Sequence, residues 1–204
     1  MAGLSSPDEA LTALRAGQCI VLPTDTVYGL CADPLREEAV QRLVSLKRRP
    51  ADMPVALVAA DFAALVEAVP ELEAAAPVAD ALLPGPYTLV LPNPWRRLTL
   101  LTGAHPETIG VRVPDLPVQA SAVLEEFGAV AATSANIHGE PDPARVADLP
   151  EVLRDGVAAI VDAGPLPGTA STVVDLTGAG PRILREGAVP AADALAAIAA
   201  ARPG

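Results

Sequence analysis

The basic residues of this chain gather in a few short runs, and one run contains the only lysine. Of the 14 basic residues, Lys47 is the single lysine, and it lies in the run Lys47-Arg48-Arg49-Pro50. Lysine carries a compact point charge on a flexible stem, whereas arginine presents a planar fork of five donors. A compact cation beside two forks suits the oxygens of a polyphosphate. The alternative is an ordinary surface charge at a helix end, which the helix dipole favours.

A second candidate for chemistry is Arg112, which lies in the middle of an apolar strand pattern. Its neighbours are Val111 and Val113. A charged side chain in that position must face a polar cavity or a buried partner. A carboxylate-bearing ligand held by a bidentate fork would satisfy Arg112, and so would an internal salt bridge to an acidic residue. Both interpretations stay open on this motif alone.

Polar side chains directly follow two other apolar runs. The segment 23–30 (Pro-Thr-Asp-Thr-Val-Tyr-Gly-Leu) follows the run 18–22, and Ser134 and Asn136 follow the run 129–132. In open α/β sheets, ligands bind outside the carboxyl ends of strands. We therefore expect a polar pocket wall from the first segment, and donors aimed at one anion from the serine and asparagine. The alternative is a set of turns and caps in which these side chains bond the local backbone.

The composition indicates a folded protein of one domain. The chain has 204 residues, of which 51% are hydrophobic, and it contains no low-complexity tract. No apolar run reaches the roughly 18 residues that a membrane span needs, and the N-terminus lacks the pattern of a signal peptide. Cys19 and Cys31 are too few for a disulfide framework and lack metal-site spacing. We expect a single cytoplasmic domain over residues 1–204, with no membrane partner.

The net charge limits the partners of the chain. It is −11, and the aromatic residues are one Trp, two Tyr and two Phe. Non-specific nucleic-acid binding depends on Lys and Arg to neutralise phosphates, and single-stranded binding depends on aromatic stacking platforms. Any nucleotide site must therefore be a local basic patch within an acidic surface.

The hydrophobic patterning predicts helices and strands that mix without strict alternation. A capping box at residues 6–9 begins the first helix, and Pro50 prevents continuation of a helix over 36–47. The predicted helices span residues 7–17, 36–47, a segment after Asp61, 71–83, 117–127 and a final segment from 190. The predicted strands are 18–22, 55–59, 87–91, 109–113, 129–132, 158–162, 172–175 and 182–184. The fold class is therefore α/β, with a twisted, mixed β-sheet flanked by helices.

Seven ordered blocks resemble the YrdC-domain family, the threonylcarbamoyl-adenylate synthases, and they span nearly the whole chain. The blocks are PTDTVYGL at 23–30, KRRP at 47–50 followed by Asp52-Met53-Pro54, PGPYTLVL at 84–91, GVRVP at 110–114, SAN at 134–136, STVVDL at 171–176 and ILREGA at 183–188. The lysine-x-arginine run together with serine-x-asparagine is the signature of that family. The resemblance favours the phosphate-binding interpretation of Lys47.

The resemblance implies an ATP-dependent nucleotidyltransferase of tRNA modification. Its reaction joins L-threonine, bicarbonate or CO2, and ATP into L-threonylcarbamoyl-AMP and pyrophosphate. A separate complex then transfers the threonylcarbamoyl group to tRNA, forming threonylcarbamoyladenosine. The implied fold is a single YrdC-like domain with a large concave, positively lined cavity. Mg²⁺ is expected with ATP, without dedicated protein ligands, and a weak tRNA or double-stranded RNA contact is a further expectation.

The resemblance also implies roles for individual residues. The catalytic residues would be the phosphate cations Lys47 and Arg49. The residues expected to bind L-threonine are Thr26, Tyr28, Arg112, Ser134 and Ser171, with Arg112 on the substrate carboxylate and Tyr28 closing the pocket. The residues expected to bind ATP are Lys47, Arg49, Met53, Thr108, Asn136 and Arg185. No residue is expected to be a metal ligand.

The chain departs from the family pattern in three places. Asp25 stands where many relatives have glutamate, which changes the reach of that carboxylate. Val58 stands where some relatives place a histidine near threonine. The chain ends soon after the block at 183–188, so we expect it to lack the second domain of longer relatives and to have a more open site.

Two other functions fit parts of the pattern. A carbamoyl-adenylate-forming domain shares the ATP motifs but uses carbamoyl phosphate, and such domains usually lie within much longer chains. A non-catalytic module for double-stranded RNA or tRNA would need an extended basic face, which a net charge of −11 does not favour. Dependence on threonine separates the first alternative from synthesis, and salt-dependent RNA affinity without ATP would indicate the second.

Overall fold

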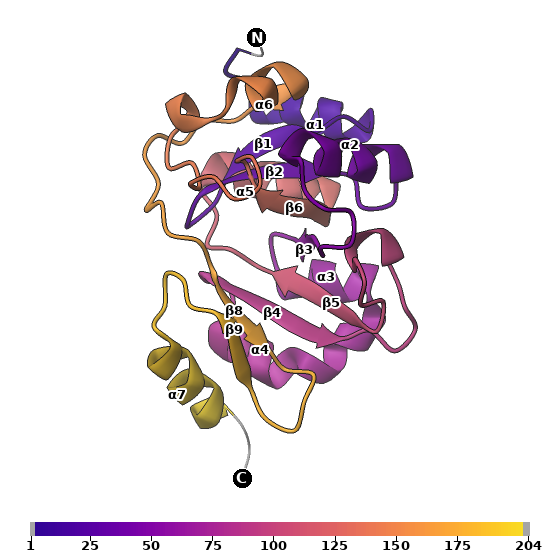
Figure 1. Ribbon diagram of the computed structural model, residues 1–204, viewed down its shortest axis with the longest axis vertical. Coiled ribbons are helices and arrows are strands. Elements are labelled where there is room, and N and C mark those ends of the chain that lie inside the picture. Colours follow the sequence, from indigo (N-terminus) through magenta and orange to yellow (C-terminus); the bar gives the residue numbers. More distant parts are fainter. Residues whose placement is uncertain (1–2, 202–204) are drawn as a thin grey trace.

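The fold is built on one twisted, mixed β-sheet with helices on both faces (Figure 1). The computed structural model describes residues 3–201 of the chain. Within this range the sheet has nine strands in the order β7-β1-β2-β6-β3-β5-β4-β8-β9. The predicted α/β fold with a mixed sheet is confirmed.

The strands are short, and most neighbours in the sheet run antiparallel. Their bounds are β1 Ile20–Pro23, β2 Tyr28–Ala32, β3 Ala56–Val58, β4 Tyr87–Pro92, β5 Thr108–Arg112, β6 Val130–Ser134, β7 Ala159–Ile160, β8 Thr172–Asp175 and β9 Arg182–Arg185. The pairs β1–β7, β3–β5 and β4–β8 are parallel. The sheet therefore brings segments from the whole length of the chain to one surface.

The helices connect these strands and cover the two faces of the sheet. Their bounds are α1 Pro7–Arg15, α2 Glu37–Lys47, α3 Phe62–Ala68, α4 Ala76–Leu82, α5 Val118–Phe127, α6 Glu151–Gly156 and α7 Ala191–Ala201, with 3-10 helices η1 Pro70–Ala75, η2 Thr99–Leu101 and η3 Val146–Asp148.

Local sequence signals fix several helix ends. The hydroxyl of Ser6 accepts from the backbone of Glu9 at 3.3 Å, and the Glu9 carboxylate accepts from the backbone of Ser6 at 2.7 Å, which confirms the capping box. Helix α2 ends at Lys47 because Arg48 adopts the left-handed conformation with φ of 52°. Lys47 is therefore in the last turn of α2, where the chain changes direction.

Two hydrophobic cores lie on opposite faces of the sheet. One core packs α2, α3, α4 and α6 against residues such as Tyr28 and Leu30. The other packs α1 and α5 against residues such as Leu22, Cys31 and Val130. Because α1 and α5 cover only one end of the second face, the central strands of that face are free to line a cavity.

The structure differs from the predicted elements in three places. The segment 23–30, interpreted as pocket wall, runs into a strand that was not predicted, β2, which pairs with β1 around a four-residue turn at 24–27. The predicted helix over 71–83 is divided into η1 and α4, because Pro77 in the first turn of α4 has no N–H to continue the earlier helix. The short helix α6 was not predicted.

Candidate functional site

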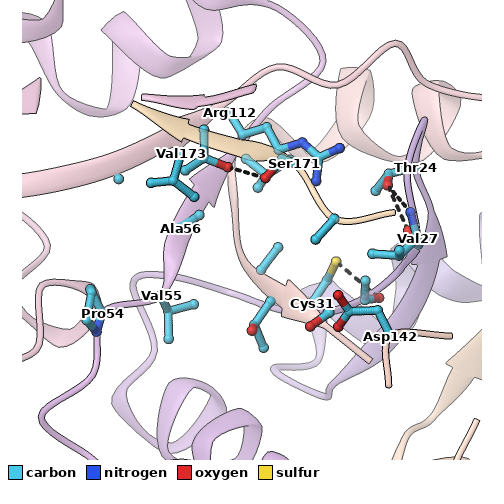
Figure 2. Close-up of a pocket in the computed structure, with 18 of the residues that line it drawn as sticks. Thr24, Val27, Cys31, Pro54, Val55, Ala56, Arg112, Asp142, Ser171 and Val173 are labelled. Atoms are coloured by element: carbon cyan, nitrogen blue, oxygen red, sulfur yellow. Dashed lines mark hydrogen bonds between the residues drawn. The ribbon is translucent and has the colours of Figure 1, made fainter. Parts of the chain in front are cut away.

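A cavity of about 440 Å³ opens on the face of the sheet that α1 and α5 leave uncovered (Figure 2). Alternate residues of the strands line it, since side chains along a strand point to opposite faces in turn. In β5 the lining residues are Thr108, Gly110 and Arg112. In β6 they include Ala132 and Ser134. The cavity floor is therefore the sheet itself.

Small residues form the middle of that floor. The register pairs Ala56 of β3 with Ala132 of β6, and it places Ala56 beside Gly110 of β5. A Cβ added at Gly110 would meet Thr88 Cγ2 at 3.8 Å and Ala56 Cα at 4.0 Å, which is ordinary contact. The absence of a side chain at Gly110 therefore provides space in the cavity and does not relieve a clash.

Four cationic side chains from separate segments line the cavity: Lys47, Arg49, Arg112 and Arg185. Burial and the charge of Arg185 lower the pKa of Arg49. Burial, Arg49 and Arg185 all lower the pKa of Lys47. These cations repel one another across the cavity, and a bound polyanion would relieve that repulsion.

Lys47 is held at the wall of the cavity by the segment that follows β6. Its ammonium donates to the carbonyl oxygen of Ser134 at 2.7 Å, to the Ser134 hydroxyl at 3.1 Å and to the Asn136 carbonyl at 3.4 Å. It also contacts the side-chain oxygen of Asn136. Only 2% of Lys47 is exposed, and burial is the main cause that lowers its pKa to about 8.

The serine and asparagine were expected to donate to an anion, and the structure corrects that expectation. The Ser134 hydroxyl donates to the Asn136 side-chain oxygen at 2.7 Å, and Asn136 Nδ2 donates to the carbonyl of Glu140 at 2.5 Å. The same two oxygens, the Ser134 hydroxyl and the Asn136 side-chain oxygen, also accept from Lys47. The two residues therefore position the lysine, because a buried ammonium requires acceptors.

Arg112 forms the internal salt bridge that was one of the two interpretations, and its side chain also lines the cavity. Its NH2 group is paired with the Asp25 carboxylate and donates to the Thr26 hydroxyl at 2.6 Å. The second oxygen of Asp25 accepts from the backbone N–H of Asp115 at 3.1 Å. One edge of the guanidinium is thus held by the protein while the side chain faces the cavity.

Two cavity arginines have a buried donor that no described residue accepts. Within residues 3–201, Nε of Arg49 and Nε of Arg112 have no hydrogen-bond partner. Buried polar groups normally find a partner, so each exception calls for a cause. An anionic ligand in the cavity would supply the acceptors for both.

The β8–β9 pair contributes the opposite wall. Arg185 donates to the carbonyl of Ser171 through Nε at 3.2 Å and through NH2 at 2.8 Å. The Ser171 hydroxyl shares a hydrogen bond of 2.8 Å with the Thr88 hydroxyl of β4. These contacts hold the Arg185 side chain at the cavity, where its charge acts on Lys47 and Arg49.

The structure corrects the prediction that Tyr28 closes the pocket. Its ring lies in the core on the other face of the sheet, and its hydroxyl donates to Asp162 at 2.5 Å and Gly164 at 2.8 Å. Along β2, Tyr28 and Leu30 face that core, whereas Gly29 and Cys31 face the cavity. Alternation in the strand therefore turns the phenol away from the site.

Thr26 also lies outside the lining of the cavity. It is fully buried, and its hydroxyl accepts from Arg112 and shares a hydrogen bond of 3.0 Å with Thr24. Its place is behind the arginine, where it orients the guanidinium. The other predicted site residues all line the cavity: Lys47, Arg49, Met53, Thr108, Arg112, Ser134, Asn136, Ser171 and Arg185.

Sequence reasoning missed several residues that line the cavity. Thr88 and Val90 share one face of β4 and alternate with the core residues Leu89 and Leu91, a period-two signal that could have revealed Thr88. Asp142 lies in a proline-rich loop without any periodic pattern, and the exposed His138 of the same loop also lines the cavity. Loop residues of this kind can be placed only by the tertiary contacts of the loop.

Between residues 3 and 201, no three His, Cys, Asp or Glu side chains come together in a way that could hold a metal ion. In that part of the chain, no helix has the length and apolar character that crossing a bilayer requires.

Comparisons with known proteins agree with this geometry. The Sua5/YciO/YrdC family model, described as "Telomere recombination", matches residues 12–187. A "Putative threonylcarbamoyl-AMP synthase" of Mycobacterium tuberculosis is 42% identical over 184 residues, which cover 88% of this chain and 83% of that protein.

Two solved structures share the fold at recognisable sequence identity. Sua5 of P. abyssi, complexed with L-threonine, has a TM-score of 0.82 and 36% identity, and the match covers 93% of this chain. YciO of E. coli has a TM-score of 0.75 and 27% identity, with 90% of each chain covered. The present chain spans 56% of the Sua5 chain, about half of its length.

Proposed function

The chain belongs to the Sua5/YciO/YrdC family, and from this we infer that it synthesises L-threonylcarbamoyl-AMP. The substrates are L-threonine, bicarbonate or CO2, and ATP, and pyrophosphate is released. The reaction is a nucleotidyl transfer and the first step in forming threonylcarbamoyladenosine on tRNA. The observation that carries the proposal is the anchored Lys47 at a cavity with three arginines.

The chemistry requires no protein nucleophile. The neutral amine of threonine attacks CO2, forming a C–N bond, and loses a proton to give a carbamate. A carbamate oxygen then attacks the α-phosphorus of ATP, and the bond to the β-phosphate oxygen breaks as pyrophosphate leaves. The protein must hold the reactants in line and neutralise the phosphate charge. A cation-lined cavity with a fixed geometry meets both needs.

We place the phosphates of ATP at Lys47, Arg49 and Arg185. The mutual repulsion of these cations would end when phosphate oxygens bind among them. Nε of Arg49 supplies a free donor for a phosphate oxygen. Lys47 would exchange one of its protein acceptors for a phosphate oxygen and keep the others.

We place the carboxylate of threonine at Arg112. Nε of Arg112 is the donor without a partner, while Asp25 and Thr26 occupy NH2. The small floor residues Ala56 and Gly110 leave room for substrate between Arg112 and the phosphate cations. This arrangement would bring the amino group of threonine toward the α-phosphate.

Mg²⁺ remains part of the proposal as an ion bound to ATP. The described residues contain no carboxylate cluster that would form a resident site, and among the residues lining the cavity the acidic one is Asp142. This donor set fits an ion that arrives with the triphosphate. When bound with ATP, Mg²⁺ would neutralise part of the charge of the triphosphate.

The partners after the reaction also remain proposals. A separate transfer complex would take the threonylcarbamoyl group from the adenylate to tRNA. A direct contact of this chain with tRNA would be weak, given its net charge of −11.

The proposal is tested by pyrophosphate release from ATP and bicarbonate, with and without L-threonine. We expect release that depends on threonine in the wild type and is lost in Lys47→Ala. A matched control is Arg48→Asn, since Arg48 is exposed in the same run and asparagine tolerates its left-handed backbone. This control should retain activity.

Other outcomes of the same assay point to other functions. Release that ignores threonine and requires carbamoyl phosphate would identify a carbamoyl-adenylate-forming domain. A folded protein that releases no pyrophosphate under any of these conditions would contradict the enzyme proposal and favour an RNA-binding module.

A further inference from the structure

Asp142 is an acidic side chain among cations. Of the described residues that line the cavity, it is the one that carries a carboxylate, whereas four carry cationic lysine or arginine side chains. Figure 2 shows it pointing into the cavity beside Val27 and Cys31. Within residues 3–201 its carboxylate takes part in no hydrogen bond and no ion pair, although its charge acts on Lys47 and raises the pKa of that lysine. Neither the proposed ATP contacts nor the Arg112 contact uses it.

The backbone around Asp142 is rigid and anchored on both sides. Pro141 and Pro143 flank it, and a residue before proline is restricted to extended conformations while proline fixes its own φ. The carbonyl of Pro143 accepts from the N–H of Tyr28 at 3.0 Å. On the other side, the carbonyl of Glu140 accepts from Asn136. The carboxylate is therefore held between the turn before β2 and the segment that anchors Lys47.

The chemistry of an amino-acid substrate explains a fixed carboxylate at this place. At neutral pH, threonine carries an α-carboxylate and an α-ammonium. Arg112 offers donors to the first group, and the other cations of the cavity would repel the second. A carboxylate acceptor is the complement that an ammonium needs, and charge-assisted hydrogen bonds of this kind are the strong ones.

We propose, resting on the proposed function, that Asp142 binds the α-ammonium of L-threonine and so selects threonine over the same acid without its amine, (R)-3-hydroxybutyrate. Arg112 and Asp142 together recognise the two charges of the zwitterion. The amine nitrogen is thereby directed into the cavity, on the side where Lys47 and the phosphates lie. Asp142 is a binding residue in this proposal and takes no part in the transfer to phosphorus.

The test measures ligand binding by calorimetry on the full chain in EDTA, with and without the unreactive analogue α,β-methylene-ATP. The two ligands are L-threonine and (R)-3-hydroxybutyrate, which is threonine without its amine. For the wild type we expect threonine to bind at least tenfold more tightly. Asp142→Asn should weaken threonine binding about tenfold or more and leave 3-hydroxybutyrate within twofold.

Two further variants make the test specific. Asp142→Glu keeps the charge and should recover part of the threonine affinity. Glu140→Gln removes an exposed carboxylate from the same loop, outside the cavity lining, and should bind both ligands as the wild type does.

The outcomes separate this inference from the proposed function. Threonine binding that is unchanged in Asp142→Asn overturns the inference and leaves the synthase proposal standing. An equal loss for both ligands also overturns it, because that result indicates a general effect through Lys47 or the loop. A parallel titration of α,β-methylene-ATP with Mg²⁺ in place of EDTA covers the remaining case: a defect confined to that ligand would overturn the inference and assign Asp142 to the metal. A folded wild type that binds no threonine in either condition contradicts both proposals.

Discussion

The ammonium of Lys47 donates hydrogen bonds to both the carbonyl oxygen and the hydroxyl of Ser134, although 87 residues separate the two in the chain. The last turn of α2 and the end of β6 meet at this contact. A buried ammonium with fixed acceptors is part of the cavity wall and not a flexible surface charge. The planar fork of arginine cannot reproduce this arrangement of donors.

Lys47→Arg should therefore abolish most activity even though it preserves the charge. We expect kcat/KM for ATP to fall at least 100-fold, because the larger planar group displaces Ser134 and Asn136 from their positions. Steady-state pyrophosphate release measures this, with Arg48→Lys as the control in the adjacent, exposed position. A Lys47→Arg enzyme within a few-fold of the wild type would show that charge alone is sufficient.

The rate should depend on the ionisation of Lys47 in a range where lysine is normally fully charged. Burial lowers its pKa from the ordinary 10.5 to about 8, with Arg49 as the next cause. Lysine is charged below its pKa and neutral above it, so kcat/KM for ATP should decline as pH rises through about 8. The pH profile of kcat/KM reports this group in the free enzyme.

The variant Arg49→Gln tests whether the pKa of Lys47 sets this pH dependence. Arg49→Gln removes a charge that repels the Lys47 ammonium, so the descending limb should move to higher pH, whatever the loss in rate. A wild-type kcat/KM that stays constant well above pH 8 would show that the pKa of Lys47 is not lowered to about 8, or that the reaction does not need the charge of Lys47.

Tyr28→Phe should reduce stability without impairing substrate binding. The variant loses the hydrogen bonds of the phenol to Asp162 and Gly164 and the one it accepts from Ala163 at 3.1 Å. The expected decrease in the free energy of unfolding is about 1–3 kcal/mol, since buried partners are left unsatisfied. Urea unfolding measures it, and KM for threonine should stay within twofold. A tenfold rise in KM with unchanged stability would place the phenol at the substrate.

Asp25→Asn should damage both stability and threonine binding, because Arg112 then loses its charged partner. The two side chains are 11% and 12% exposed, so the guanidinium would be left buried without a counter-charge. We expect a loss of about 3 kcal/mol in the free energy of unfolding, and a higher KM for threonine. Urea unfolding and kinetics measure the two effects. Asp25→Glu keeps the charge and should be milder, whereas a wild-type KM in Asp25→Asn would show that Arg112 needs no such orientation.

Gly110→Val should leave the fold intact and block the cavity. A Cβ at this position makes only ordinary contacts, so the new side chain would fill the floor of the cavity between Thr88 and Ala56. We expect at least a tenfold loss of pyrophosphate release with a nearly unchanged melting temperature, and a smaller loss in Gly110→Ala.

A second glycine provides the opposite expectation. Gly103 has φ of +57°, and a Cβ there would overlap the carbonyl of Asp52, so Gly103→Ala should be destabilised.

An active, stable Gly110→Val protein would mean that substrates do not use the middle of the floor.

The sequence predicted those parts of the fold and site that depend on local patterns. The capping box at Ser6 and the end of α2 before Pro50 are local, and both are found in the structure. The serine and asparagine that follow a strand were expected in a ligand site, and both line the cavity beside the ammonium of Lys47.

Other features depend on tertiary contacts and could not be predicted locally. Strand β2 is buried on both faces, so its apolar pattern gives no sign of which face looks into the cavity, and Tyr28 was assigned to the wrong one. The position of Asp142 depends on the bond between Pro143 and Tyr28, which joins a loop to a strand far away in sequence. The ion pair of Arg112 with Asp25 was one of two open interpretations, and only the three-dimensional structure identifies the partner.

The most direct test of the central proposal follows the carbon of bicarbonate. The purified chain is incubated with labelled bicarbonate, ATP and L-threonine, and the products are separated by chromatography. The proposal predicts a labelled adenylate that forms only when ATP and threonine are both present, with one pyrophosphate released for each, and that is absent with Lys47→Ala. Pyrophosphate release without labelled adenylate, or labelled adenylate that forms without threonine, would contradict it.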